Sequence, residues 1–226
     1  MASNRFGAAL FDVDGTLLDS TDFVVGAFQH TLASHGVTPP SRQAVAELLG
    51  PSLADCYQLV APQLDPRLLC ATHRAWQKER IHLVHPFPHV ADTLRELRAA
   101  GVRLAAVTAR SRISSLGTLE NSGLSGLIEF TISAEDVART KPDPAALHLA
   151  LARLGLPATT AVMIGDTRAD ILAGKAAGTA TIGVTYGFHG IKLAESQPDY
   201  LVHDIRELPA ILLCGTTHPH SHAKTR

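Results

Sequence analysis

The strongest constraint on the fold is an apolar run that ends in two carboxylates, Leu10-Phe11-Asp12-Val13-Asp14-Gly15-Thr16-Leu17. The residues from Ala8 to Phe11 predict a short strand buried on both faces, and Gly15 predicts the turn that ends it. Carboxylates at positions i and i+2 of an extended segment point the same way. Two such charges need neutralising, and a hard divalent cation such as Mg²⁺ would do so. An Asp-rich turn or a helix cap would explain Asp14 but not Asp12.

From residue 90 onward, helical and strand patterns alternate along the chain. The expected strands cover 104–107, 128–132, 161–164, 181–184 and 200–202. The expected helices cover 90–100, 113–121, 144–154 and 169–177, the third opened by Asp143 and Pro144 and closed by Gly155. This alternation predicts an α/β fold with a doubly wound, mostly parallel, Rossmann-like sheet. Ligands of such sheets bind beyond the carboxyl ends of the strands.

Residues 17–86 show a different pattern, because no strand signal occurs between Thr16 and Pro86. Turn residues separate helical patterns instead. The expected helices run from Ser20 or Thr21 to Gly36, and then over 42–49, 53–60 and 66–83. We therefore predict a small all-helical cap at 17–86, inserted into a core formed by residues 1–16 and 87–215.

Composition excludes several classes of function. Apolar residues make up 46% of the 226, enough for a well-buried core, and the net charge of −1 does not predict a nucleic-acid or anionic-membrane surface. Cys56, Cys70 and Cys214 lack metal-ligand spacing and are typical of reduced thiols. With no apolar run that spans a bilayer and no signal-peptide pattern, we expect a cytoplasmic protein. We predict a disordered tail at 216–226, although its spaced histidines could bind a metal.

Four segments carry residue types suited to phosphoryl chemistry. Asp12 is a candidate nucleophile that could form an aspartyl-phosphate, and Asp14 could donate a proton and later accept one. Thr108 follows an expected strand, where its hydroxyl could bind a phosphoryl oxygen, although threonine is common at such turns. Lys141 stands between a threonine and Pro142, where its ammonium could lie between Asp12 and a phosphate. A solvated surface lysine is the alternative.

The segment from Gly165 to Asp170 also follows an expected strand. Gly165 permits close backbone approach, and Asp166 offers a metal ligand at the strand end. Asp170 lies one helical turn later, where it could face the same site and orient its neighbours. Alternatively, Asp166 could be an ordinary helix N-cap and Asp170 a first-turn acid favoured by the helix dipole.

The order Asp-x-Asp-Gly-Thr, Thr108, Lys141-Pro142 and Gly165-Asp166-x-x-x-Asp170 resembles the motifs of the haloacid dehalogenase superfamily, in its phosphatase branch. The resemblance runs from Ala8 to about Val184. It implies that the helical insert is the family's cap, which closes over the active site and selects the substrate.

Carried onto this chain, the resemblance implies that Asp12 is the nucleophile and Asp14 the general acid and base. The carboxylates of Asp12 and Asp166, with the backbone carbonyl of Asp14, would hold Mg²⁺. The remaining implied roles are phosphoryl binding by Thr108 and Lys141, support of the metal site by Asp170, and a turn toward the cap at Gly15 and Thr16.

Candidate substrate residues come from two loops. The segment Gly50-Pro51-Ser52 lies where relatives place substrate contacts, so Gly50 and Ser52 are candidates, although a helix-joining turn explains the segment equally well. Near relatives often carry Asn after the motif Thr, whereas this chain has Ala109 and then Arg110, whose charge could bind substrate. The insert also carries basic residues that could meet a carboxylate or a second phosphate, although on a long helix such residues more often form a solvated face. They are His73, Arg74, Lys78, Arg80, His82 and His85.

The resemblance implies a Mg²⁺-dependent phosphatase that hydrolyses a small phosphorylated metabolite through an aspartyl-phosphate. The whole chain is most similar to phosphoglycolate phosphatases and their near relatives, which include pyrophosphatases. A phosphosugar mutase shares the core and the cap and is the nearest alternative enzyme. A receiver domain is shorter and places its accepting Asp after a later strand. A non-catalytic binding or regulatory protein on the same fold is the remaining alternative.

Overall fold

A six-stranded parallel sheet forms the centre of the computed structural model, which describes residues 4–213. The strand order is β5-β4-β1-β6-β7-β8, and every pairing is parallel. The strands are β1 (Ala8–Phe11), β4 (Arg103–Val107), β5 (Thr131–Ile132), β6 (Ala161–Gly165), β7 (Ala180–Val184) and β8 (Tyr200–Val202). Strand β1 pairs with β4 on one side and β6 on the other, so the winding direction reverses at β1. The predicted doubly wound sheet is confirmed.

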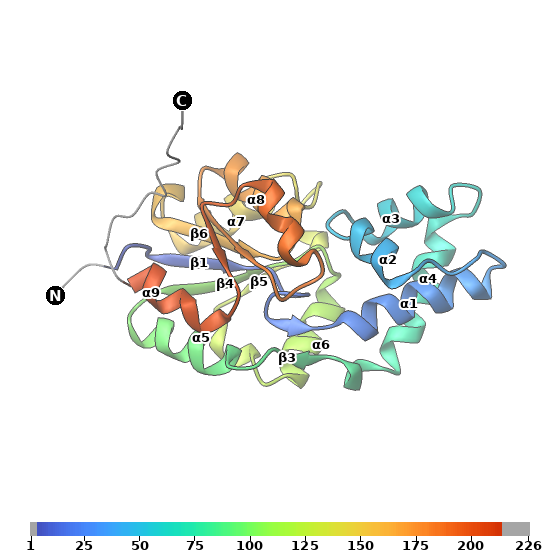
Figure 1. Ribbon diagram of the computed structural model, residues 1–226, viewed down its shortest axis with the longest axis horizontal. Helices are drawn as coiled ribbons and strands as arrows, with labels where there is room; N and C mark the ends of the chain where they lie inside the picture. The colour runs from blue at the N-terminus through green and yellow to red at the C-terminus, as the bar shows by residue number, and fades with distance from the viewer. Residues whose placement is uncertain (1–3, 214–226) are drawn as a thin grey trace, which may run out of the picture.

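Helices cover both faces of this sheet (Figure 1). On one face lie α5 (Val90–Ala99), α6 (Arg112–Asn121) and α9 (Leu208–Leu213), and on the other α7 (Ala145–Leu154) and α8 (Arg168–Ala177). Successive side chains of β1 pack on opposite faces of the sheet, because side chains alternate in direction along a strand. Ala8 and Leu10 belong to the same apolar cluster as Leu147 of α7, whereas Ala9 and Phe11 belong to the cluster that includes α5.

Four helices form a separate lobe to one side of the sheet (Figure 1). They are α1 (Thr21–Ser34), α2 (Arg42–Leu48), α3 (Leu53–Val60) and α4 (Pro66–Lys78), hereafter the helical lobe. Its interior is apolar and includes Phe28 and Tyr57, whose ring centroids lie 5.0 Å apart. Such burial is what holds short helices together, since they are marginal in isolation.

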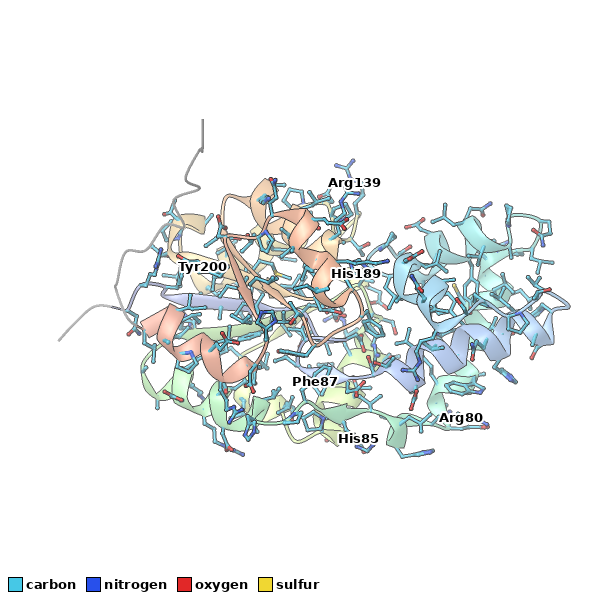
Figure 2. All side chains as sticks on the ribbon, in the orientation of Figure 1. Arg80, His85, Phe87, Arg139, His189 and Tyr200 are labelled. Carbon is cyan, nitrogen blue, oxygen red and sulfur yellow. The ribbon has the colours of Figure 1, made fainter. Side chains whose placement is uncertain are left out.

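The two chain crossings between the sheet and the helical lobe pair with each other. β2 (Leu18–Asp19) and β3 (His85–Pro86) form a short antiparallel ribbon. The sequence predicts no strand here, because a two-residue strand shows no alternation of polar and apolar side chains. Phe87 follows β3 (Figure 2). Its ring centroid lies 4.7 Å from that of Tyr186, whose hydroxyl donates to the Thr16 carbonyl at 3.1 Å.

His189 makes a second connection between the helical lobe and the rest of the chain (Figure 2). Its Nδ1 accepts a hydrogen bond from the Arg168 backbone N–H at 3.2 Å. Its Nε2 lies 3.2 Å from the Ala46 carbonyl of α2, to which it donates, since Nδ1 acts as the acceptor. One imidazole thus joins the start of α8 to the helical lobe.

The predicted helix over 66–83 is wrong in extent, because α4 ends at Lys78 and a 3₁₀ turn, η1 (Ile81–Leu83), follows. The cause is Arg80, whose Nη1 donates to the Trp76 carbonyl at 3.2 Å while its guanidinium lies 4.6 Å from the Trp76 ring centroid. A side chain that donates a hydrogen bond to a carbonyl of the last helical turn helps to end the helix. The other 3₁₀ turns are η2 (Ser125–Leu127), η3 (Ala134–Asp136), η4 (Ala158–Thr160), η5 (Gly190–Ser196) and η6 (Ile205–Glu207).

Of the strand predicted over 128–132, only β5 (Thr131–Ile132) forms as regular strand. Hydrogen bonds to β4 nevertheless begin earlier in the segment. The Glu129 N–H donates to the Leu104 carbonyl at 2.9 Å, and the Ala106 N–H donates to the Phe130 carbonyl at 3.0 Å. The turn η2 leaves few residues for this edge strand.

Helix ends agree with the predicted signals, with small shifts. Gly155 and Gly178 occupy left-handed C-cap positions, with φ of 66° and 76°. Helix α7 begins at Ala145, one residue later than predicted. The Asp143 carboxylate accepts a hydrogen bond from the Ala145 N–H at 3.0 Å. Ser20 occupies the N-cap position of α1, but the carboxylate that accepts from the Thr21 N–H belongs to Asp19.

Cys56 and Cys70 are buried and free, as predicted. Cys214 and the predicted tail at 216–226 lie outside the described residues. Within 4–213, none of the helices combines the length and the apolar character that crossing a membrane requires.

Candidate active site

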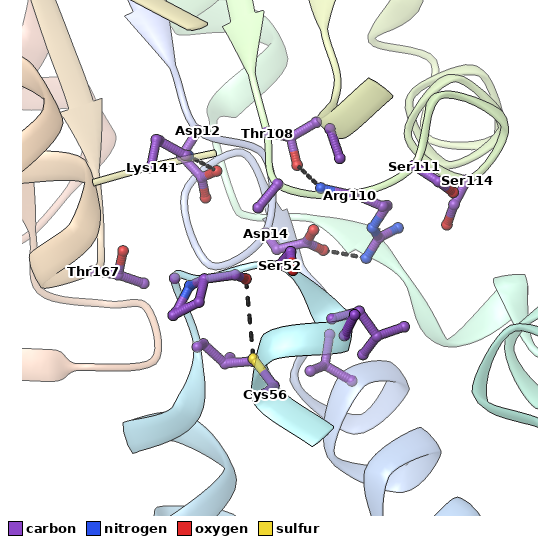
Figure 3. A pocket seen from close by; sticks show the side chains of 18 of the residues that line it. Asp12, Asp14, Ser52, Cys56, Thr108, Arg110, Ser111, Ser114, Lys141 and Thr167 are labelled. Carbon is purple, nitrogen blue, oxygen red and sulfur yellow. Dashed lines mark hydrogen bonds and ion pairs between the residues drawn. The ribbon is translucent and has the colours of Figure 1, made fainter. Parts of the chain in front are cut away.

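The predicted site residues meet at the carboxyl edge of the sheet, beside β1. Asp12 follows β1, Thr108 follows β4, and Asp166 follows β6. Lys141 comes from the loop between η3 and α7 and lies against Asp12 (Figure 3). Because winding reverses at β1, the loops leaving the neighbouring strands diverge there and leave room for a ligand.

Lys141 joins two carboxylates from different segments. Its Nζ lies 2.6 Å from Asp12 Oδ1 and 2.6 Å from Asp170 Oδ1, and it donates to the Val107 carbonyl at 2.8 Å. Its side chain is only 3% exposed, so Lys141 is not a solvated surface lysine. Although burial lowers the pKa of Lys141, the charges of Asp12 and Asp170 raise it above its ordinary value. The ammonium is therefore held charged.

Asp166 is fully buried and held by two donors. Its Oδ2 accepts from the Phe188 backbone N–H at 2.7 Å, and its Oδ1 accepts from the Thr16 hydroxyl at 3.3 Å. Gly15 has a φ of 80°, and a Cβ there or at Gly187 would overlap the Asp166 carboxylate. Glycine is needed at both positions for this close approach. Burial, then the neighbouring Asp12 and Asp170, raise the pKa of Asp166 well above its ordinary value.

Asp170 serves both the helix and the site. Its Oδ2 accepts from the Thr167 N–H at 2.9 Å and from the Thr167 hydroxyl at 2.6 Å, in the capping box of α8. The N-cap residue is therefore Thr167, not Asp166. The other oxygen of Asp170 remains for Lys141. A Cβ at Gly165 would overlap Asp170, which explains the glycine that precedes Asp166.

Three buried carboxylates form a candidate metal site. Oxygens of Asp12, Asp166 and Asp170 all lie within 4.8 Å of one another. Burial, with smaller contributions from the charges of Asp170 and Asp14, raises the pKa of Asp12 to about 7 against the lowering effect of Lys141. Three carboxylates that share one ammonium leave an excess of negative charge out of water. Hard oxygen donors in such a cluster fit a divalent cation of the Mg²⁺ type.

The Asp14 carboxylate turns away from this cluster and pairs with Arg110 (Figure 3). The Arg110 Nη1 also donates to the Thr118 hydroxyl at 3.1 Å, and its guanidinium lies 5.1 Å from the Phe23 ring centroid. Arg110 was a candidate substrate ligand, but its guanidinium is already engaged by other side chains. The Thr108 hydroxyl accepts from the Arg110 backbone N–H at 3.1 Å, which leaves its own proton for another acceptor.

A cavity of about 300 Å³ lies between these residues and the helical lobe. Gly50 and Ser52 line it, as the sequence analysis allowed. Gly50 has a φ of 126° and packs so closely on α8 that a Cβ would lie 2.8 Å from the Ala169 Cβ. The Ser52 hydroxyl caps α3, because it accepts from the Asp55 N–H at 3.3 Å and donates to the Asp55 carboxylate at 2.6 Å. Both residues are thus also explained by local structure.

Helix α4 forms part of the cavity wall. His73 and Arg74 line it, although the sequence favoured a solvated face over contact with a carboxylate or second phosphate, and Gln77, which was not predicted, lines it too. Their spacing on one side of the helix was the available signal. Phe188 also lines the cavity. It follows β7 with no pattern of its own, so only the chain path could place it.

Comparison with known proteins agrees with this geometry. The sequence profile of the haloacid dehalogenase-like hydrolase family matches residues 9–184. Pyrophosphatase PpaX from Bacillus pumilus is 34% identical over 213 residues, which cover 94% of this chain and 99% of that protein.

Solved structures show the same fold over nearly the whole chain. A predicted phosphoglycolate phosphatase from Haemophilus somnus superposes with a TM-score of 0.83 at 25% identity, covering 92% of this chain and 98% of that one. A haloacid dehalogenase-like family hydrolase from Streptococcus pneumoniae gives 0.82 at 26% identity, with 91% and 98% covered. The chain therefore belongs to the haloacid dehalogenase-like hydrolase family, as an enzyme of the phosphatase kind.

Proposed function

We propose that the protein is a Mg²⁺-dependent phosphatase that hydrolyses a small phosphorylated metabolite, a phosphoglycolate-like phosphomonoester, through an aspartyl-phosphate. The observation that carries the proposal is the buried cluster of Asp12, Lys141, Asp166 and Asp170 at the base of the cavity. A nucleophilic carboxylate, a fixed ammonium and a set of metal-binding oxygens are what attack on a charged phosphoryl group requires.

Asp12 is the proposed nucleophile. One of its carboxylate oxygens bonds to phosphorus as the bond between phosphorus and the leaving oxygen breaks. Lys141 holds the Asp12 carboxylate in place and offsets the charge of the phosphoryl oxygens, and the Thr108 hydroxyl donates to one of those oxygens. Thr108 directly follows β4, and the Lys141 ammonium is held by Asp12, Asp170 and the Val107 carbonyl, so both groups are in place before substrate arrives.

Asp14 is the proposed proton carrier. Its carboxyl gives a proton to the leaving oxygen, and its carboxylate then accepts a proton from the water that attacks the aspartyl-phosphate. The attack by water breaks the bond between Asp12 and phosphorus. Inorganic phosphate is released, and the free Asp12 carboxylate is regained. Because Asp14 pairs with Arg110, it must leave that partner to reach the leaving oxygen.

The residues that would hold Mg²⁺ are Asp12 and Asp166 through their carboxylates and Asp14 through its backbone carbonyl, with Asp170 in support. When bound, the cation supplies positive charge that stabilises the phosphoryl oxygens and keeps Asp12 ionised.

The helical lobe is the proposed cap, over residues 17–86. It forms one wall of the cavity, and the β2–β3 ribbon is where a closing movement would turn. Closure would exclude water that otherwise competes at the phosphoryl group.

The test is a phosphate-release assay over a panel of phosphorylated metabolites, with Mg²⁺ and with EDTA. We expect Asp12→Asn to lower kcat by at least about a thousandfold while the melting temperature stays near that of the wild type. Asp92→Asn is the matched control, because Asp92 lies on the surface in an exposed pair with Arg95. Retained activity in Asp12→Asn would remove the proposed nucleophile.

Pyrophosphate hydrolysis is a second candidate, favoured by the 34% identity to Pyrophosphatase PpaX over nearly its full length. The same attack by Asp12 would then release phosphate as the leaving group. Rates on pyrophosphate and on phosphoglycolate, measured with one preparation, separate the two candidates.

A further inference from the structure

The cavity contains four basic side chains among the described residues: Lys141, Arg110, His73 and Arg74. Two of them already bind carboxylates. Lys141 contacts Asp12 and Asp170, and Arg110 pairs with Asp14. Neither can give its full charge to the part of a substrate that points away from the phosphoryl group.

His73 is held neutral. It is 3% exposed, its Nδ1 lies 2.8 Å from the Tyr57 hydroxyl, and its ring meets Phe28 edge-on at 5.0 Å between centroids. Burial, together with the positive charges of Arg110 and Arg74, lowers the pKa of His73 to about 3. A neutral imidazole supplies shape and one N–H, but no charge.

Arg74 differs from these three. It is exposed at the edge of the cavity, and within residues 4–213 its side chain makes no hydrogen bond or ion pair. Nearby Arg67 and Arg80, by contrast, each pair with a carboxylate. Gln77 lies one turn further along the same face of α4 and also lines the cavity. The helical lobe therefore presents one uncommitted guanidinium with a neighbouring amide.

We propose that Arg74 is a specificity-determining residue that binds a negatively charged group on the leaving part of the substrate. This inference rests on the proposed function, because it takes the phosphoryl group to lie at Asp12. The leaving part then faces the opposite wall, which the helical lobe provides. A guanidinium binds a carboxylate or a second phosphoryl group through two parallel N–H bonds, which an ammonium cannot match.

The experiment compares substrates with and without a charge on the leaving group, in the presence of Mg²⁺. Pyrophosphate and phosphoglycolate carry such a charge, whereas p-nitrophenyl phosphate does not. For Arg74→Gln we expect kcat/KM on the two charged substrates to fall about ten- to a hundredfold, mainly through KM. On p-nitrophenyl phosphate it should change by less than about twofold. Arg74→Lys should restore part of the loss.

Arg67→Gln is the matched control, since Arg67 is on the same helix but points to solvent with a 91% exposed side chain. It should leave all three rates unchanged. An equal fall on all three substrates in Arg74→Gln, or no fall on any, would overturn the proposal. If the wild type hydrolyses none of the three, the proposed function fails instead.

A binding measurement tests Arg74 without turnover. In an Asp12→Asn background with Mg²⁺ present, calorimetric titration with inorganic pyrophosphate should show about tenfold weaker affinity after Arg74→Gln. Equal affinity with and without Arg74 would overturn the inference, whatever the protein hydrolyses.

Discussion

Replacing Lys141 by methionine tests whether this lysine compensates the buried carboxylates. The substitution keeps most of the length of the side chain and removes its charge, leaving Asp12, Asp166 and Asp170 buried without a cationic partner. Removing one partner of a buried ion pair costs about 3 to 5 kcal/mol. For a chain of this size, that loss lowers the melting temperature by about 6 to 20 °C.

The assay is thermal unfolding at neutral pH in EDTA. The raised pKa of Lys141 makes its stabilising charge fully present below the ordinary lysine value and lost only as pH rises through the folded-state value. Neutral pH therefore measures the whole effect. Lys192→Met is the matched control, because Lys192 pairs with Glu47 at 3.7 Å with both side chains about two-thirds exposed. It should cost at most about 1 kcal/mol.

Adding Mg²⁺ should return part of the stability lost in Lys141→Met, since a divalent cation supplies charge to the same carboxylates. A Lys141→Met protein that melts within about 2 °C of the wild type in EDTA would refute the reasoning. The three carboxylates would then be neutralised by protons or water, not by the lysine.

Three further predictions concern the same site. Mg²⁺ should raise the melting temperature of the wild type but not of Asp166→Asn, measured by scanning calorimetry with and without EDTA; an equal rise in both would exclude Asp166 as a ligand. Because the pKa of Asp12 is raised to about 7, the folded, metal-free protein binds more protons than the unfolded chain between about pH 4 and 7. Its free energy of unfolding should therefore fall as pH rises through that range, and urea titrations of Asp12→Asn should show a smaller fall. Gly15→Ala should abolish metal binding and activity because its Cβ would overlap the Asp166 carboxylate, whereas Gly123→Ala, also at positive φ but in open space, should cost only about 1 kcal/mol. Wild-type activity in Gly15→Ala would contradict the close packing at Asp166.

Much of the fold was predictable because the controlling signals are local. The buried strand at Ala8–Phe11 and the glycine ends of α7 and α8 depend on a few neighbouring residues. The β2–β3 ribbon was missed because each strand has two residues and is stabilised by a partner far away in sequence. The early end of α4 depends on how Arg80 folds back over Trp76, which residue spacing does not encode.

The candidate site shows the same division. Asp12 and Asp166 could be selected from motifs at strand ends and Lys141 from the Lys-Pro motif before α7, and the structure brings the three together. The contacts of Arg110 with Asp14, Thr118 and Phe23 could not be predicted from the sequence, because these residues lie up to 96 positions apart. The place of Arg74 on the cavity wall depends on which side of α4 packs against α1 and α3 and which side faces the cavity.

The sequence by itself determined which residues could carry charge, bind a metal or end an element, because these properties belong to single side chains and short segments. It also determined the parallel sheet, since strand and helix periodicity alternate along the chain. Only the tertiary structure decided which charges neutralise one another and which remain free. Coulomb energy and desolvation depend on distance and burial, and both arise only when remote segments pack together.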